Sequence, residues 1–258
     1  MRDPRSLVIT GASSGIGAAL AELYAAPRRT LLLVGRDADR LEAVAEKVRA
    51  EGGVAEIALV DTTDRPALVA ALTEFDDRHP VDILIANAGV AAGLGSGRAR
   101  ESDADIDRQI AINLTGTLNT VNALVERMRQ RRGGAICMTS SIAGLQPVAD
   151  LPTYSATKAA IAAYGTALRR WLRRAKVSVT VICPGFVATP MAAKHHGAKP
   201  FEVTPDFAAR EVRAAIQRRA ALRVFPWQFR WLIRFGTLTP DVIVDRITDL
   251  FEAEVGAK

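Results

Sequence analysis

The chain has 258 residues, of which 49% are hydrophobic and 24% are charged. Together with only 12 prolines and 19 glycines, this composition excludes a disordered or collagen-like chain and supports a large buried core. The two cysteines, Cys137 and Cys183, are too few for a disulfide scaffold and lie in apolar runs, so we expect both to be reduced core residues. The formal net charge of +6 permits an anionic partner but does not require one.

Short β-branched runs alternate with longer helical runs along the chain. The pattern predicts strands at Leu7–Thr10, Thr30–Gly35, Val54–Val60, Ile83–Ala86, Ala135–Thr139, Ser178–Cys183 and Arg223–Phe225. It predicts helices at Ile16–Ala26, Ala38–Ala50, Pro66–Asp77, Ala104–Arg129, Tyr154–Arg174 and Asp206–Arg219. Near-continuous Val, Ile and Leu runs are typical of strands covered on both faces. We therefore expect an α/β protein with a doubly wound parallel sheet of about seven strands, formed by residues 1–258 as a single domain.

A glycine-rich turn, Thr10–Gly17, joins the first strand to the first helix. Glycines at this place allow a tight turn and a close approach of the backbone to a phosphate, with the N–H groups of the following helix facing it. The turn therefore predicts a dinucleotide site. Its candidate ligands are Gly11, Ser13, Ser14, Gly15, Ile16 and Gly17.

The ordered motifs resemble the short-chain dehydrogenase/reductase family, whose glycine turn T-G-x-x-x-G-x-G is matched by Thr10–Gly17. Further matches are the Asp after the third strand, the N-A-G motif after the fourth, a helical Asn, a Ser with Y-x-x-x-K, and P-G with a Thr beyond it. These are Asp61, Asn87, Ala88, Gly89, Asn113, Ser141, Tyr154, Lys158, Pro184, Gly185 and Thr189. The resemblance is close over residues 6–190 and implies a Rossmann fold, a nicotinamide cofactor, and a carbonyl or alcohol substrate.

The resemblance also implies roles for these residues. Asp61 would hold the adenine, Asn87–Gly89 would line the cofactor site, and Pro184-Gly185 with the Val187 backbone and the Thr189 hydroxyl would face the nicotinamide carboxamide. Asn113 would hold a water that links Lys158 to solvent.

The end of the second strand bears on the choice between NADP and NAD. An NAD-selective site places an acidic side chain here to bind the ribose 2′-hydroxyl, and this sequence has Gly35 instead. Arg36 follows and would pair with a 2′-phosphate through its planar guanidinium. We therefore favour NADP over NAD. Asp37 is expected to cap the next helix, and Ser14 stands where NADP-using relatives often carry a second basic residue.

Tyr154 and Lys158 are four residues apart, so on a helix they share one face. A nearby cation favours the phenolate, so we expect Lys158 to lower the pKa of Tyr154, which we assign as the general acid/base. By family resemblance, Lys158 would also bind the nicotinamide ribose. The Ser141 hydroxyl would hydrogen-bond the substrate oxygen, with Ser140 as the competing candidate.

The region beyond residue 190 is less typical of the family. Residues 191–225 are predicted to form a substrate lid, a helix that begins at Thr204-Pro205, and the last strand. Residues 226–258 are predicted to form a helical tail. The aromatic segment Phe225–Phe235 contains Arg230 and Arg234, and it could be buried on its own domain, cover the substrate cleft, form a subunit contact, or lie on an anionic membrane surface. The aromatic-rich tail is also a weak indication that the substrate is apolar.

The sequence thus predicts an NADP-dependent oxidoreductase that interconverts a carbonyl and an alcohol. Its alternatives are a non-catalytic dinucleotide-binding regulator and an epimerase or dehydratase on the same fold. We expect a cytoplasmic homodimer or homotetramer, with no signal peptide, spanning helix, metal site or nucleic-acid partner. The paired histidines His195-His196 have no companion ligands at metal-binding spacing. The basic clusters Arg127–Arg132 and Arg169–Lys176 are expected at helix ends.

Overall fold

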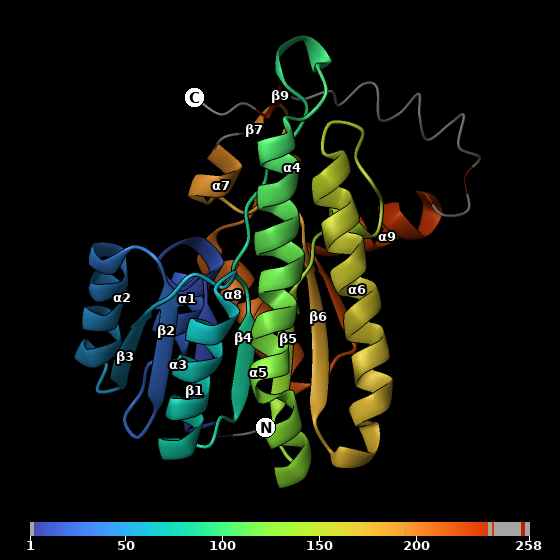
Figure 1. The fold of residues 1–258 in the computed structure, drawn as a ribbon. Helices are drawn as coiled ribbons and strands as arrows, with labels where there is room; N and C mark the ends of the chain where they lie inside the picture. Colours follow the sequence, from blue (N-terminus) through green and yellow to red (C-terminus); the bar gives the residue numbers. More distant parts are fainter. Residues whose placement is uncertain (1–2, 194, 237–238, 240–253, 256–258) are drawn as a thin grey trace.

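A computed structural model describes residues 3–193, 195–236, 239 and 254–255. Seven strands form one sheet in the order β3-β2-β1-β4-β5-β6-β8, and every neighbouring pair is parallel (Figure 1). The strands are β1 (Ser6–Thr10), β2 (Thr30–Gly35), β3 (Val54–Leu59), β4 (Ile83–Ala86), β5 (Ala135–Thr139), β6 (Ser178–Pro184) and β8 (Leu222–Phe225). The predicted doubly wound sheet is therefore confirmed.

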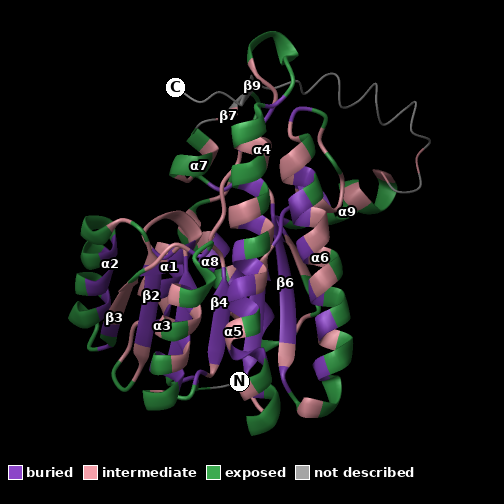
Figure 2. Cartoon of the chain, in the orientation of Figure 1, coloured by how far each residue is buried: buried purple, intermediate pink, exposed green. Residues whose placement is uncertain are grey.

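Helices cover both faces of this sheet, because side chains alternate along each strand. In β1, Leu7 and Ile9 belong to one buried cluster and Val8 to the other. One face carries α1 (Gly15–Tyr24), α2 (Ala38–Ala50) and α8 (Pro205–Gln217). The other carries α3 (Arg65–Arg78), α4 (Asp103–Gln109), α5 (Gly116–Arg131) and α6 (Pro152–Leu172). The strands are accordingly buried along most of their length (Figure 2).

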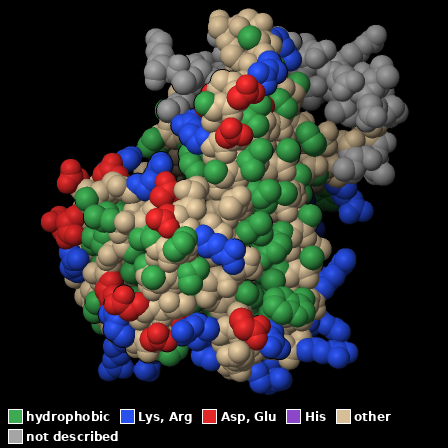
Figure 3. Space-filling model, in the orientation of Figure 1, with side chains coloured by type: hydrophobic (Ala, Val, Ile, Leu, Met, Phe, Trp, Pro, Cys, Tyr) green, Lys and Arg blue, Asp and Glu red, His purple; other side chains and the backbone are tan. Residues whose placement is uncertain are grey.

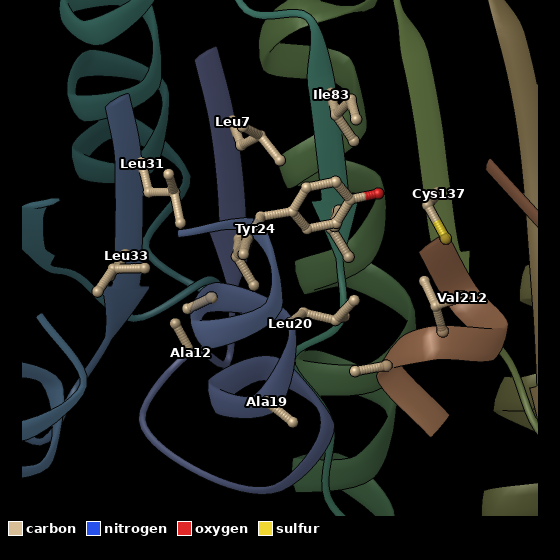
Figure 4. Packing of buried hydrophobic residues seen from close by; sticks show 14 of the residues in the cluster. Leu7, Ala12, Ala19, Leu20, Tyr24, Leu31, Leu33, Ile83, Cys137 and Val212 are labelled. Atoms are coloured by element: carbon tan, nitrogen blue, oxygen red, sulfur yellow. The ribbon is translucent and has the colours of Figure 1, made fainter. Parts of the chain in front are cut away.

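The first helix is anchored to the sheet by its own apolar side. Leu20 and Tyr24 of α1 pack beside Leu7 and Ile83 of the sheet, and Val212 of α8 belongs to the same cluster (Figure 4). This packing fixes the direction of α1, so that the glycine turn at its start is held at the carboxyl edge of the strands. Both cysteines are buried and free, as expected.

Predicted helix starts agree with the structure where a cap was identified. The Asp37 carboxylate accepts a hydrogen bond from the Arg40 N–H at 3.0 Å, and the Thr204 hydroxyl accepts one from the Phe207 N–H at 3.2 Å. Short 3₁₀ segments occur at Ser96–Arg98 (η1), Ile142–Gly144 (η3) and Arg173–Ala175 (η4).

The long helix predicted at Ala104–Arg129 is not regular. Its middle, Ile110–Thr115, is a π-helix (η2) that lies between α4 and α5. Single π turns inside α-helices are frequent at functional sites, and this one contains Asn113. The prediction was therefore right about a continuous helical rod and wrong about its regularity.

Beyond β6 the chain forms α7 (Pro190–Ala193) and a two-stranded antiparallel sheet of β7 (His195–His196) and β9 (Glu254–Val255). The aromatic helix α9 (Trp227–Gly236) follows β8. Only Phe229 of α9 is buried, whereas Trp227, Trp231, Leu232 and Phe235 are exposed. Residues 237–238, 240–253 and 256–258 of the predicted tail lie outside the described residues, and Glu254–Val255 form a strand instead of the predicted helix.

Basic side chains gather along the lower edge in Figure 3, where α5 and α6 end. Two of them are structural: Arg127 and Arg131 both bind the buried Asp76, at 3.2 and 2.6 Å. The predicted position of these clusters at helix ends is confirmed. Among the described helices, none is long and apolar enough to cross a membrane.

Candidate active site

A cleft of about 400 Å³ opens at the carboxyl edge of the sheet. Its walls come from the segments after β1, β2, β3, β4, β5 and β6. The order in which strands are added reverses between β1 and β4, so that β2 and β3 lie on one side of β1 and the later strands on the other. In open α/β sheets, ligands bind at such a switch point. The cleft brings together these predicted residues: Gly11, Ser13, Ser14, Gly15, Ile16, Arg36, Asp61, Asn87, Ala88, Gly89, Ser141, Tyr154, Lys158, Pro184, Gly185, Val187 and Thr189. Gly17 and Asn113 do not line it.

The glycine turn has the shape that a phosphate group requires. Gly11 and Gly15 have φ angles of +66° and +56°, a region that side chains disfavour. Gly17 lies behind the turn, where an added Cβ would overlap the Gly11 carbonyl oxygen. Ser14 makes no side-chain cap to α1, so the first N–H groups of that helix remain available to a ligand. The turn therefore fits the pyrophosphate of a dinucleotide.

The Asn87 segment is fastened to this turn by Thr10. The Thr10 hydroxyl accepts hydrogen bonds from the backbone N–H groups of Asn87 and Ala88, at 3.0 and 3.2 Å. The Asn87 amide in turn donates to the Thr10 carbonyl at 3.3 Å. These bonds hold two walls of the cleft together at the switch point.

Arg36 and Asp61 form the end of the cleft that an adenosine would occupy. Arg36 Nη1 lies 3.1 Å from Asp61 Oδ2. Burial alone would raise the pKa of Asp61, but hydrogen bonds from Thr63 and the Arg36 charge lower it below its usual value. The Arg36 side chain is 64% exposed, so its guanidinium also remains open to solvent. Arg40, one turn into α2 and paired with Asp37 at 2.7 Å, lines the same end of the cleft.

Tyr154, Lys158 and Ser141 meet at the other end. Both Tyr154 and Lys158 are on α6, with Lys158 Nζ 5.5 Å from the centre of the Tyr154 ring. Lys158 Nζ also donates to the Thr139 carbonyl at the end of β5, at 3.0 Å. Ser141 follows β5 directly, and its hydroxyl hydrogen-bonds with Tyr154. The strand end and the helix face thus place a hydroxyl pair beside a lysine.

Burial dominates the protonation of this group. It raises the pKa of Tyr154, against the effect of the Ser141 hydrogen bond, and it lowers the pKa of Lys158 to about 8. The expected lowering of the Tyr154 pKa by Lys158 is therefore not found in the structure. The reason is physical: a half-buried phenolate loses more hydration than a lysine 5.5 Å from its ring centre restores. A raised pKa keeps Tyr154 protonated at neutral pH.

Ser140 and Ser141 have different partners. The Ser140 hydroxyl donates to the Lys158 carbonyl at 2.7 Å, so it is engaged in holding β5 against α6. The Ser141 hydroxyl faces the cleft and accepts from the Ala143 N–H at 3.1 Å. This difference favours Ser141 as the residue that contacts a ligand.

Asn113 lies behind the cleft, fully buried within the π-helix. Its amide group accepts from the Val90 N–H at 2.8 Å and donates to the Val90 carbonyl at 2.9 Å. It therefore fixes the segment after β4, whose residues Gly89, Val90 and Ala91 line the cleft. Asn113 and Lys158 leave little room for a side chain at Gly89, because an added Cβ would lie 3.2 Å from Asn113 Oδ1 and 3.3 Å from Lys158 Nζ.

The Pro184-Gly185 segment is supported from behind by the aromatic helix. An added Cβ on Gly185 would overlap the ring of Phe229, and the Phe229 ring packs edge-on against Phe201 at 5.6 Å. The backbone of the cleft wall therefore rests on α9. Thr189 closes the opposite side, where its side chain contacts Gly15.

Several cleft residues were not identified from the sequence. Arg40 has a recognisable signal, since it lies one helical turn after Arg36. The apolar wall beyond Tyr154 had none, because its members come from separate loops. They are Val90, Ala91, Ile142, Val148, Leu151 and Phe186. Met191 and His195 also line the cleft, and they lie in the segment 191–225 that the sequence predicted as a substrate lid.

The fold and the cleft define a dinucleotide-binding protein of the Rossmann class. Residues 5–199 match the family model described as short chain dehydrogenase. The chain belongs to the short-chain dehydrogenase family, and it is an oxidoreductase of that family. It is 31% identical to an uncharacterised oxidoreductase of Myxococcus xanthus over 243 residues, which cover 93% of this chain and 95% of that relative. An uncharacterised oxidoreductase of Staphylococcus saprophyticus is 35% identical over 188 residues, 72% of this chain and 79% of the relative.

Two solved structures are informative about the cofactor. A short-chain dehydrogenase from Sphingobium yanoikuyae in complex with NADPH has a TM-score of 0.79 and 28% identity, covering 90% of this chain and 93% of that one. A short chain dehydrogenase from Mycobacterium paratuberculosis bound to NAD has a TM-score of 0.75 and 26% identity, covering 85% and 95%. The similarity supports a nicotinamide cofactor. One of the two structures holds NADPH and the other holds NAD.

Proposed function

We propose that this protein is an NADP-dependent oxidoreductase that interconverts a carbonyl and an alcohol, with Tyr154 as the general acid/base. The observation that carries the proposal is the meeting of Tyr154, Ser141 and Lys158 in one cleft with the glycine turn. A site without turnover would need the turn but not this group. The proposal covers both reduction of the carbonyl and oxidation of the alcohol.

The bound nicotinamide would supply or accept the hydride. The chain's own residues handle the proton. In reduction, the Tyr154 hydroxyl, which burial keeps protonated, donates its proton to the substrate oxygen as negative charge develops there. The Ser141 hydroxyl donates a hydrogen bond to the same oxygen. Lys158 is held by the Thr139 carbonyl and adds positive charge beside the ring, while Asn113 positions the Val90 segment.

The rival function is a dinucleotide-binding regulator that lacks turnover, and an assay distinguishes the two. NADPH oxidation over a panel of aldehydes and ketones is expected to exceed the protein-free rate for at least one compound. Tight NADPH binding without oxidation of any compound would favour the regulator. An epimerase or dehydratase would change a nucleotide sugar without net NADPH consumption.

Arg36 is the proposed reader of the 2′-phosphate, and NADP is expected to give a higher kcat/KM than NAD. The variant Arg36→Ser should lose about 10- to 100-fold in kcat/KM with NADP and change little with NAD, because a charge-assisted hydrogen bond contributes about 1.5–3 kcal/mol. Initial rates with both cofactors measure this. Arg210→Ser, exposed on α8 and outside the cleft lining, is the matched control. Equal or higher kcat/KM with NAD in the wild type would contradict the assignment.

We also propose a division of labour along the chain. Residues 1–258 would form one domain. Within it, residues 1–190 would bind the cofactor and carry the chemistry, residues 191–225 would form the substrate lid with the last helix and strand, and residues 226–258 would form a tail.

We also propose that the protein is a homodimer or homotetramer in the cytoplasm, with no nucleic-acid partner. In its favour, α6 exposes an apolar stripe of Ala163, Ala167 and Trp171, and hydrophobic side chains gather over the α5 and α6 face (Figure 3).

The exposed aromatic face of α9 is assigned to a protein contact in preference to a membrane surface. Trp227 and Trp231 are 67% and 51% exposed and share the helix with Arg230 and Arg234. The full-length protein is expected to stay in the supernatant when anionic vesicles are sedimented. Co-sedimentation that a Trp227→Gln/Trp231→Gln variant loses would instead establish a membrane contact.

A further inference from the structure

The cleft divides into two parts of opposite character. The cofactor part, from the glycine turn to Arg36, Arg40 and Asp61, is polar and charged. The part beyond Tyr154, which we call the substrate part, is lined by Val90, Ile142, Val148, Leu151, Phe186 and Met191. These side chains carry no hydrogen-bonding group, so in this part a ligand can be oriented mainly by its carbonyl at Tyr154 and Ser141.

Among the described residues of the substrate part, no arginine and no lysine other than Lys158 lines the wall. Lys158 is 3% exposed, and its ammonium group is directed to the Thr139 carbonyl. Among the described residues of the wall, His195 is the ionisable side chain added to Tyr154 and Lys158, and its ring packs on Phe186 with the centroids 5.1 Å apart. The cationic residues Arg36 and Arg40 line the cofactor end.

Two buried carboxylates stand behind the same wall. Glu101 is 4% exposed and accepts hydrogen bonds from the Thr153 backbone and hydroxyl, directly before Tyr154. Asp150 is also 4% exposed, precedes Leu151, and lies 3.2 Å from Arg98. Arg98 balances the charge of Asp150, and neither carboxylate lines the cleft. An anionic group placed in the substrate part would lose its hydration, and among the described residues of the wall no arginine, and no lysine beyond the engaged Lys158, would compensate the loss.

We infer that the substrate is a neutral, predominantly apolar ketone or aldehyde, and that the site rejects carbonyl compounds whose substituent carries a carboxylate or phosphate into the substrate part. The inference rests on the proposed function, because it names the substrate class of that site. Specificity then arises from desolvation: an apolar substituent gains by leaving water, whereas an anionic one of similar size loses its hydration.

The test uses matched pairs of ketones with the full-length protein and NADPH. One pair is 2-octanone and 7-oxooctanoate, and the second is 4-phenyl-2-butanone and its para-carboxylate. The neutral member is expected to have about 100-fold higher kcat/KM in each pair.

Met191 provides a matched pair of variants. It lines the substrate part on α7 and is 38% exposed, so a polar replacement should not disturb the core. Met191→Arg introduces a cation and should raise kcat/KM for the carboxylate. The ratio of kcat/KM for the neutral ketone to kcat/KM for the carboxylate should therefore fall at least tenfold. Met191→Gln, polar but neutral, should leave the preference within about threefold of the wild type.

The outcomes separate this inference from the proposed function. A wild-type preference below tenfold, or equal effects of Met191→Arg and Met191→Gln, overturns the apolar-substrate inference alone. Failure of every neutral and charged carbonyl compound to oxidise bound NADPH would instead overturn the proposed function.

Discussion

Replacing Tyr154 by phenylalanine is expected to lower kcat for carbonyl reduction by about 10³-fold, because it removes the proton donor but leaves the ring in place. The ring keeps its contact with the Lys158 ammonium, so the fold of the site should persist. Steady-state NADPH oxidation measures the loss of turnover. NADPH fluorescence titration measures affinity, which should stay within about threefold of the wild type.

Tyr164 supplies the control for this variant. It lies on the same helix, and its hydroxyl donates to Asn122 Oδ1 at 3.2 Å, outside the cleft. Tyr164→Phe should keep nearly full turnover. Retained turnover in Tyr154→Phe would rule out the acid/base assignment, whereas loss of both turnover and NADPH affinity would point to a structural role for the hydroxyl.

The order of elements was predictable because each strand and helix has a local signal. The apolar runs of β1 to β6 need two covered faces. Asp37 and Thr204 mark helix starts, because their side chains accept a hydrogen bond from a backbone N–H of the first turn. Motif spacing then assigned the cofactor end of the cleft. The glycine turn is a local structure, so the dinucleotide site could be predicted from it without knowledge of any tertiary contact.

The non-local features were not predictable in this way. The π-helix contains Asn113, whose side chain makes two hydrogen bonds with Val90, 23 residues away. The apolar wall depends on loops after β4, β5 and β6 that meet only in the folded sheet. The protonation of Tyr154 was also misjudged, since helical spacing reports the proximity of Lys158 but not the burial that outweighs it.

The second large effect concerns Lys158, where function and stability are expected to oppose each other. Burial lowers its pKa from 10.5 to about 8, which corresponds to a penalty of about 3 kcal/mol for holding the charge in the folded protein. Lys158→Met removes that penalty but leaves the Thr139 carbonyl without this donor, at a cost of about 1–2 kcal/mol. We expect a net gain of about 1–2 kcal/mol in the free energy of unfolding at pH 7, and at least a 100-fold loss of turnover.

The gain should depend on pH in a defined direction. In the unfolded chain Lys158 titrates near 10.5, so between pH 8 and 10.5 the unfolded state binds more protons than the folded state. Wild-type stability from this group therefore rises with pH across that window, and the full penalty applies below pH 8. The advantage of Lys158→Met should be largest at pH 7 and shrink toward pH 10.

Urea unfolding of both proteins at pH 7 and 9.5 measures this difference. Lys47→Met is the matched control, because Lys47 is 62% exposed and its pair with Glu22 lies at the surface. It should show no gain in stability and keep its turnover. A Lys158→Met protein that is less stable than the wild type at pH 7, or whose advantage grows with pH, would contradict a buried, charged lysine at this site. The expected result would mean that the fold tolerates a destabilising cation because the reaction at Tyr154 needs it.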